Sequence, residues 1–309
     1  MTIERHTPGS DAAWHRLRGR DVTASVIGAL FDAHPYMTEL ELWGQKTGRL
    51  RRDSAETEAT RRGRLLEPVA VQILREDHPD WTITHNAAEN IYFRDPDARI
   101  GATPDVLVNH PERGLGVIQI KSVEAGAYRR NWLDDDGNVD APLWIALQAT
   151  TEAHLTEARW AAVAPMVIGY GIEMPLIDVP IVDGIWAAIT ERVGEFWSMV
   201  EDGREPRVDY ARDGAVIDRL HEIGDPASEV DLSDDDRIPD LLSRREQLRA
   251  AMAAAKDGLS EIDTEIKAKM GAAQVAHIGR GRRITWATRK RAAVTTPSSI
   301  YRALSYPKS

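Results

Sequence analysis

The chain has 309 residues, a formal net charge of −10 and no cysteine. Its length fits one large domain or a domain with an appendage, and the missing cysteines exclude disulfides and Cys-ligated zinc or iron–sulfur clusters. The N-terminus lacks an apolar signal region, and no run of about 18 apolar residues occurs. We therefore expect a cytoplasmic protein with no membrane span.

The negative charge is concentrated in one segment, because residues 201–240 hold 14 acidic residues and 5 arginines. Arginine clusters occur elsewhere, at 49–64 and 280–291. A polyanion responds to local potential more than to net charge. The acidic composition therefore does not exclude DNA as a partner.

Residues 14–25 read as a turn-rich segment, followed by an apolar run that predicts a helix with its N-cap at Thr23 or Ser25. A hydroxyl at a helix N-terminus beside the guanidinium of Arg18 can bind a phosphate. The alternative is a simple helix cap next to a surface arginine.

Residues 54–77 predict a helix with an apolar stripe at helical spacing. Glu67 lies at the edge of that stripe, where a carboxylate usually needs a partner. Arg64 and Arg75 are the ordinary candidates. Pro68 is expected to bend this helix or divide it in two.

Two strand candidates flank the Asp95-Pro96-Asp97 turn, and a hairpin follows over 101–122. Asp105 begins its first strand, while Gln119 and Lys121, two apart on the second, share a face. This arrangement is typical of metal-dependent phosphodiesterases. Asp105 and position 119 would bind Mg²⁺ or Mn²⁺, and Lys121 would position the attacking water.

Residues 125–142 read as a loop whose Arg129 and Arg130 could line a DNA path, with a solvated acidic turn at 134–137. An amphipathic helix over 143–157, strands over 160–182 and a helix over 185–200 follow. These elements predict an α/β fold with a mixed sheet flanked by helices.

The remaining chain predicts an acidic linker or surface segment over 206–240 and a C-terminal arm over 241–309. The arm contains one long amphipathic helix, or a helical hairpin broken near Gly258, that packs on its own domain or forms an oligomer contact. A basic β-hairpin comes last. Its Arg282 and Arg283 either contact DNA phosphates or only aid solubility.

Taken together, the motifs resemble the PD-(D/E)XK nucleases and, among them, the YqaJ-type viral recombinases, the family of the bacteriophage lambda exonuclease. The resemblance covers residues 14–200 and implies a restriction-endonuclease-like core over 1–205. Its motifs, in chain order, are Trp14-His15-x-Leu17-Arg18, Thr23-Ala24-Ser25, Gly63-x-x-x-Glu67, Pro104-Asp105 and Gln119-x-Lys121.

The resemblance assigns a role to each matched position. It implies that Arg18 and Ser25 bind a 5′-phosphate, and that Gln148 supports the site. The implied metal ligands are Glu67, Asp105, position 119 and the carbonyl of Ile120.

Two positions depart from the family pattern. The family has Asp or Glu where this chain has Gln119. The difference reflects natural variation, natural loss of activity or a deliberate Glu→Gln replacement. The lost charge should slow catalysis. Related bacterial recombination nucleases have Tyr where this chain has Glu152.

The resemblance implies a Mg²⁺-dependent 5′-to-3′ double-strand DNA exonuclease of phage-type recombination. Such an enzyme leaves a 3′ single strand for an annealing protein and can assemble as a homo-oligomeric ring. The alternatives are a non-catalytic DNA-end-binding protein and an endonuclease on the same fold.

Overall fold

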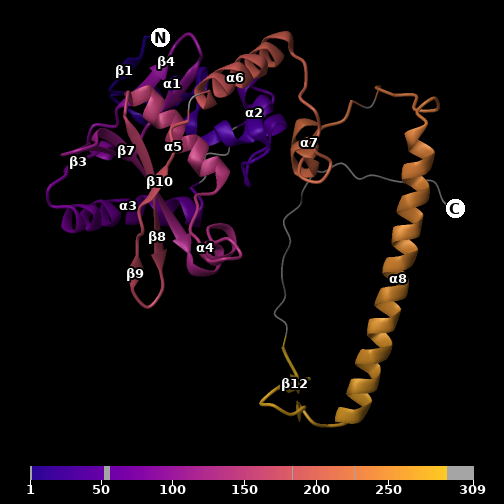
Figure 1. Ribbon diagram of the computed structural model, residues 1–309. Coiled ribbons are helices and arrows are strands. Elements are labelled where there is room, and N and C mark those ends of the chain that lie inside the picture. Colours follow the sequence, from indigo (N-terminus) through magenta and orange to yellow (C-terminus); the bar gives the residue numbers. More distant parts are fainter. Residues whose placement is uncertain (1, 52–55, 183, 226, 291–309) are drawn as a thin grey trace. The chain divides into compact units, whose positions relative to one another are not determined.

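The computed structural model describes residues 2–51, 56–182, 184–225 and 227–290. The chain divides into two compact units, Met1–His221 and Glu222–Ser309 (Figure 1). Among the described residues, none of the helices has the length and hydropathy of a transmembrane segment.

A mixed sheet forms the centre of the first unit, in the strand order β10-β8-β7-β6-β3, with β9 paired to β8. Strands β6 and β7 form the predicted antiparallel hairpin, whereas β7 and β8 are parallel. The strands are β3 (Thr82–His85), β6 (Val106–His110), β7 (Gly114–Glu124), β8 (Trp160–Ile168), β9 (Ile172–Glu173) and β10 (Ile177–Val179).

Alternate residues of β7 and β8 point to opposite faces, and each face is covered by a helix. Ile118 and Ile120 pack with residues of α3 (Glu58–Asp77), whereas Val117 and Val163 pack with residues of α5 (Leu143–Thr156). The same alternation places Gln119 and Lys121 on the α5 face. This is the predicted α/β arrangement of a restriction-endonuclease-like core.

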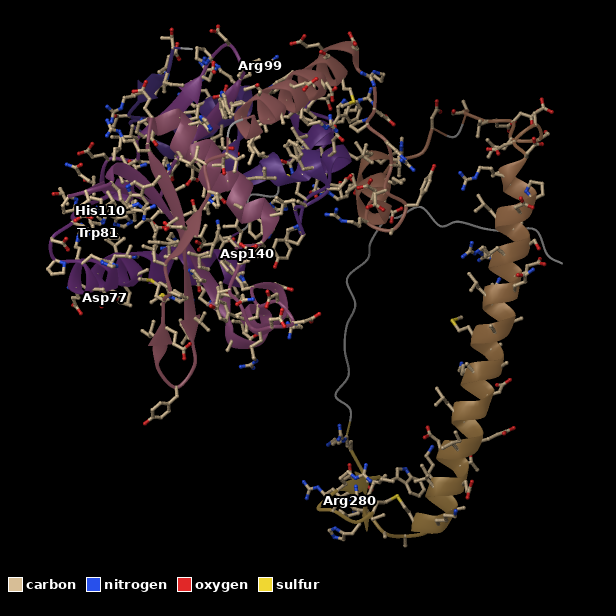
Figure 2. All side chains as sticks on the ribbon, viewed as in Figure 1. Asp77, Trp81, Arg99, His110, Asp140 and Arg280 are labelled. Carbon is tan, nitrogen blue, oxygen red and sulfur yellow. The ribbon has the colours of Figure 1, made fainter. Side chains whose placement is uncertain are left out.

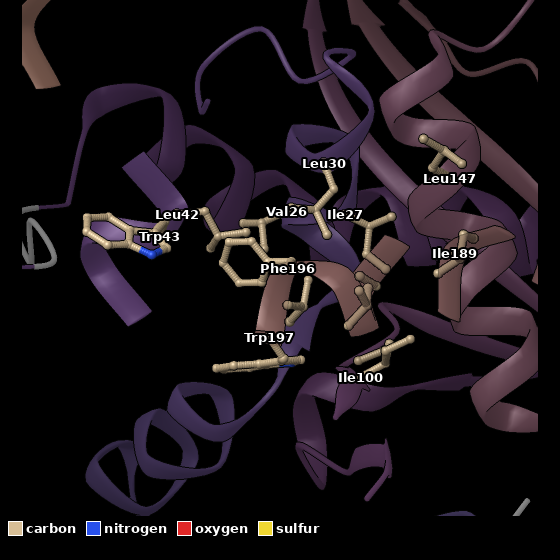
Figure 3. Packing of buried hydrophobic residues seen from close by; sticks show 14 of the residues in the cluster. Val26, Ile27, Leu30, Leu42, Trp43, Ile100, Leu147, Ile189, Phe196 and Trp197 are labelled. Atoms are coloured by element: carbon tan, nitrogen blue, oxygen red, sulfur yellow. The ribbon is translucent and has the colours of Figure 1, made fainter. Parts of the chain in front are cut away.

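A second sheet, in the order β1-β4-β5-β2, packs with helices in a separate hydrophobic cluster. Figure 3 shows part of that cluster, with Phe196 and Trp197 from α6 and Trp43 from α2. Its elements are β1 (Glu4–His6), β2 (Val22–Thr23), η1 (Ala24–Phe31), α2 (Glu39–Lys46), β4 (Tyr92–Asp95), β5 (Ile100–Ala102), α6 (Ile185–Asp202) and α7 (Gly214–Leu220).

An aromatic cluster closes the end of the hairpin opposite Asp105. The Trp81 ring lies 4.9 Å from the His110 ring and 5.8 Å from the Trp160 ring, between ring centroids. Figure 2 shows Trp81 and His110 next to each other. This packing holds the turn between β6 and β7 against the start of β8.

Several sequence predictions are wrong in detail. Residues 101–108 do not form one strand, because β5 ends at Ala102 in one sheet and β6 begins at Val106 in the other. Pro104, which has no N–H group, lies between them. The α3 helix is not divided, because Pro68 lies inside a single element.

Two segments predicted without helices contain them. Helix α1 (Asp11–Arg20) occupies most of the expected turn-rich segment and is capped by Ser10, whose Oγ accepts from the Ala13 N–H. Helix α4 (Ala125–Asn131) occupies the start of the expected loop, capped by the Glu124 carboxylate. These short polar helices depend on caps rather than on apolar periodicity. A short 3₁₀ turn, η2 (Asn86–Ala88), follows β3.

The second unit consists of α8 (Arg237–Met270) and a hairpin of β11 (Val275–His277) with β12 (Arg283–Thr285). The helix continues through Gly258, so the prediction of a single long helix is confirmed. Leu248, Met252 and Leu259 are exposed on it. The basic hairpin is also confirmed.

Candidate active site

The hairpin register brings Asp105 and Gln119 together. Val106 pairs with Ile118, so the residue before β6 lies opposite position 119. Asp105 Oδ2 accepts a short hydrogen bond from Gln119 Nε2 and one of 2.9 Å from the Ile120 N–H. Asn86 fixes the approach to this point, because its Nδ2 donates to the Pro104 carbonyl at 3.0 Å.

A chain of hydrogen bonds continues from Gln119 to Lys121 through Gln148 on α5. Gln148 Nε2 donates to Gln119 Oε1 at 2.8 Å, and Lys121 Nζ donates to Gln148 Oε1 at 2.9 Å. A protonated lysine side chain can only donate, so in that state it sets the orientation of both amides. The predicted residues Asp105, Gln119, Lys121 and Gln148 therefore form one network.

The orientation of Gln119 matters for metal binding. Its amide nitrogen contacts both Asp105 Oδ2 and the Ile120 carbonyl, the latter at 3.2 Å. These two oxygens were expected to bind the cation. In this conformation Gln119 presents N–H groups to them, and its own oxygen faces Gln148.

Glu67 approaches from α3, and the partner it has is neither of the two ordinary candidates, Arg64 and Arg75. Its carboxylate lies 2.7 Å from His85 Nε2, whereas Arg64 pairs with Glu56. His85 ends β3, where its backbone pairs with Val106 beside Asp105. The sequence offered only strand alternation as a signal for this histidine.

Burial and charge shift the ionisation of the site. Removal from water, followed by the nearby negative charge of Glu67, raises the pKa of Asp105 to about 7. Burial lowers the pKa of the Lys121 amine against the opposing attraction of Asp105. Two carboxyl groups that oppose each other's ionisation favour a cation between or beside them.

The donor atoms fit a hard divalent cation in part. Asp105, Glu67 and the Ile120 carbonyl offer oxygen, the ligand atom that Mg²⁺ and Mn²⁺ prefer. Within the described parts of the chain, no group of three His, Cys, Asp or Glu side chains is placed to hold a metal. An acidic residue at position 119 would add a charged oxygen ligand to this set, and the neutral Gln119 does not.

A third acid of the site, Glu152, was not predicted as a functional residue. It is 1% exposed on α5, and its Oε1 accepts from Gln148 Nε2 at 2.9 Å. Burial, followed by the charge of Asp105, raises the pKa of Glu152 to about 8. The sequence signal was an acid four residues after Gln148, in a helix with no other Asp, Glu, Lys or Arg.

The predicted phosphate ligands also lie together. Arg18 Nη2 is 3.3 Å from Ser25 Oγ and 3.5 Å from Thr23 Oγ1. Thr23 is the N-cap residue of η1, but its side chain makes no capping bond to the helix. Lys46 Nζ donates to the Arg18 carbonyl at 2.8 Å.

A buried ion pair holds this segment in place. Asp21, fully buried between α1 and β2, accepts from Arg94 Nη2 at 2.8 Å and from the Tyr92 hydroxyl at 3.0 Å. Both donors belong to β4. The backbone between Arg18 and Ser25 is therefore anchored to the second sheet.

Aromatic contacts connect the two candidate sites. The His34 ring, just after η1, lies 5.0 Å from the Trp144 ring of α5. Lys121 Nζ lies 5.3 Å from the Trp144 ring centroid. Gly28 allows this approach, because a Cβ there would meet Trp144 Cβ at 2.7 Å.

The arginines expected to contact DNA backbone are distributed over both units. Arg129 and Arg130 are exposed on α4, just beyond the end of β7. Arg282 and Arg283 lie in the second unit, where Arg283 begins β12. Arg291, part of the C-terminal arginine cluster, lies outside the described residues.

The mixed sheet with its α5 crossover and its β6–β7 hairpin has the fold of a PD-(D/E)XK nuclease, a hydrolase. Residues 13–159 match the family model of the YqaJ-like viral recombinase domain.

Solved structures with a similar fold include an alkaline exonuclease from Laribacter hongkongensis, with 19% identity, a TM-score of 0.44 and coverage of 67% of this chain and 98% of that one. A putative exonuclease from Eubacterium rectale has 10% identity, a TM-score of 0.45 and coverage of 73% and 97%. A SOX–DNA complex has 11% identity, a TM-score of 0.40 and coverage of 63% and 68%. No curated protein matches the chain.

Proposed function

We propose that this nuclease is a divalent-metal-dependent exonuclease that degrades the 5′-ended strand of duplex DNA and leaves a 3′ single strand. The observation that carries the proposal is the hydrogen-bonded network from Lys121 through Gln148 and Gln119 to Asp105. It lies in a YqaJ-like domain, connected by aromatic contacts to the pairing of Arg18 with Ser25.

In this proposal Asp105, Glu67 and the Ile120 carbonyl would hold Mg²⁺ or Mn²⁺, and position 119 would complete the set if its oxygen were turned toward them. The bound cation would polarise the phosphate and acidify a water molecule. Lys121 orients that water and takes its proton, which the lowered pKa of its buried amine favours. Gln148 holds the amine in place.

The end of the DNA is selected by its phosphate. Arg18 and Ser25 supply a guanidinium and a hydroxyl to a 5′-phosphate, a charge-assisted contact that a 5′-hydroxyl end cannot make. Arg129 and Arg130, with Arg282 and Arg283, contact the DNA backbone. The 3′ strand is then available to a single-strand annealing protein, and copies of the chain assemble as a ring around DNA.

The neutral Gln119 makes the enzyme slow. A missing ligand charge at a phosphoryl-transfer site costs several kcal/mol of transition-state stabilisation, on the order of two or more powers of ten in rate. We expect Gln119→Glu to raise the nuclease rate at least about tenfold. The exposed Gln247→Glu on α8 adds the same charge elsewhere and should leave the rate unchanged. An unchanged rate in Gln119→Glu would remove position 119 from the site.

The deciding experiment incubates wild type and Gln119→Glu with linear 5′-phosphorylated duplex and with closed circular DNA, each with Mg²⁺ and with EDTA. Loss of linear DNA alone, only with Mg²⁺, is the expected result. Cutting of closed circles would favour an endonuclease instead. If both proteins bind DNA ends tightly and neither cuts them, the result would favour a non-catalytic end-binding protein.

A further inference from the structure

A cluster of three rings lies between the two candidate sites, and one of its rings is exposed. The His34 ring lies 5.0 Å from the Trp144 ring and 6.1 Å from the Tyr36 ring, between ring centroids. The Tyr36 and Trp144 rings are 6.4 Å apart and almost perpendicular, at 83°. His34 is buried, whereas Tyr36 is 81% exposed. Because perpendicular rings do not cover each other face to face, the exposed Tyr36 keeps an open face.

Hydrogen bonds hold the segment that carries Tyr36. The Tyr36 N–H donates to His34 Nδ1 at 3.2 Å. Burial lowers the pKa of His34 to about 4, so its ring is neutral near pH 7 and this nitrogen can accept. Arg212 donates to the His34 carbonyl and, at 3.3 Å, to the Met37 carbonyl. Thr38 follows as the N-cap of α2. An aromatic ring held exposed in this way is pre-organised for a ligand.

The cluster reaches both candidate sites. At one end the His34 ring is hydrogen-bonded to the backbone of Ser25, whose Oγ lies beside Arg18. At the other end Lys121 Nζ lies 5.3 Å from the Trp144 ring centroid. A terminal nucleotide with its 5′-phosphate at Ser25 and its 3′-phosphodiester at Lys121 would therefore have its base beside these rings.

The simpler alternative is a cluster that only packs η1 against α5. His34 and Trp144 already make that contact, and Gly28 allows their close approach. Tyr36 adds little buried surface to it, because most of the residue is exposed. Packing therefore accounts for His34 and Trp144 but not for Tyr36.

Resting on the proposed function, we propose that Tyr36 and Trp144 form a stacking surface for the base of the 5′-terminal nucleotide after that base has left the duplex. Bases in a duplex are stacked on one another, so the terminal base loses a neighbour when its strand turns into the active site. Stacking on an aromatic ring replaces that contact, and it accepts any base because every base has a π-face. The surface thus recognises the presence of a base and not a sequence.

The first test measures equilibrium binding in EDTA to duplexes whose 5′-phosphorylated terminal nucleotide either carries a base or is abasic. We expect wild type to prefer the complete end at least about fivefold, a typical effect of one stacked base. Tyr36→Leu should lose most of this preference, whereas Tyr36→Phe should keep it, because a phenyl ring also stacks. Tyr210→Leu, an equally exposed tyrosine, is the control and should bind as wild type does.

The second test identifies the base that contacts the ring. A 5-iodouracil base, which forms photo-cross-links with aromatic side chains in contact with it, is placed at the 5′-terminal nucleotide, at the third nucleotide or at the 3′ terminus. Mass spectrometry should find a cross-link to Tyr36 from the 5′-terminal position alone. The same cross-link should be absent in Tyr36→Leu.

The results separate this inference from the proposed function. An equal preference for the complete end in wild type and Tyr36→Leu, or a cross-link from the 3′-terminal base, would overturn the stacking role whatever the nuclease assay shows. If wild type and Gln119→Glu both fail to cut linear DNA, the exonuclease is removed, while a preference lost in Tyr36→Leu would still support the stacking surface. If wild type does not bind DNA ends, both proposals fail.

Discussion

At the scale of single residues, the amide nitrogen of Gln119 takes the place between two oxygens that a cation would be expected to bridge. It donates to Asp105 and to the Ile120 carbonyl, so both have a partner without metal. A Glu at this position could not donate to either oxygen and would leave them dependent on a cation. One atom thus determines whether the site is complete without metal or needs it.

The ionisation of Asp105 predicts a pH dependence. Burial and the charge of Glu67 raise its pKa to about 7, above the usual value for Asp, so the carboxyl is mostly protonated below that pH and cannot bind a cation. At limiting Mg²⁺ we expect the nuclease rate to rise about tenfold per unit below pH 7 and to level off above about pH 8.

The cation and the proton compete for Asp105, so higher Mg²⁺ should move the midpoint of this profile to lower pH. Rates measured at several Mg²⁺ concentrations check both the profile and its shift. A flat profile across the same interval would contradict the assignment of Asp105.

Arg18 carries a second residue-scale prediction. Its guanidinium lies beside Ser25 Oγ, and Arg18→Ala should reduce the preference for 5′-phosphorylated over 5′-hydroxyl duplex ends about tenfold or more. The 5′-hydroxyl duplex is the matched control, because its binding should change little. Competition binding with the two duplexes measures the ratio. An equal loss of affinity for both ends would indicate a general backbone contact instead.

At the scale of elements, the site depends on how closely η1 packs against α5. The His34 and Trp144 rings bridge the two elements, and Gly28 is the position of closest approach. Ser25 belongs to η1, and Gln148 and Glu152 belong to α5. The distance between the phosphate candidates and Lys121 therefore depends on this contact.

Gly28→Ala tests that contact. The added methyl group would meet Trp144 at 2.7 Å, so we expect the free energy of unfolding to fall by about 1–3 kcal/mol and the nuclease rate to fall with it. Gly63→Ala is the control, since its Cβ would meet nothing within 4 Å and alanine favours the α3 helix. Thermal unfolding and rate assays check both variants. Equal effects of the two substitutions would contradict this account.

At the scale of the whole molecule, the chemistry and the long α8 helix belong to different units. The candidate active site lies within Met1–His221, and α7 packs into the same hydrophobic cluster as α6. The basic hairpin belongs to the second unit. The DNA contact proposed for this hairpin can therefore be tested without changing the network around Asp105.

Replacing Arg282 and Arg283 by alanine should weaken binding to all duplex sequences alike. If each arginine contacts one phosphate, the slope of log affinity against log salt should fall by about 2, at roughly 0.9 per contact. The control removes two positive charges from α8 with Arg249→Ala and Lys256→Ala. Titrations at several salt concentrations provide the slopes. An unchanged slope would contradict the phosphate contacts and indicate that the hairpin only aids solubility.

Local pattern accounts for the elements that were predicted well. The hairpin of β6 and β7, the helix α3 and the long helix α8 follow from turn residues and from periodicity within one segment. The amphipathic prediction for α5 was wrong, because the helix is buried on nearly all sides between the sheet and η1. A helix covered on two sides loses the polar face by which amphipathic patterns are recognised.

The sequence by itself determined that Gln119 and Lys121 share a face, because a strand alternates with a fixed period of two. It also predicted Asp105 at the start of the neighbouring strand, which begins one residue later, at Val106. Only the tertiary structure decided that His85 pairs with Glu67, that Glu152 reaches Gln148, and that the Gln119 amide turns its nitrogen toward Asp105. These contacts join residues from different elements, and the orientation of an amide depends on the donors around it. The spacing of residues along one segment predicts neither the contacts between elements nor the orientation of an amide.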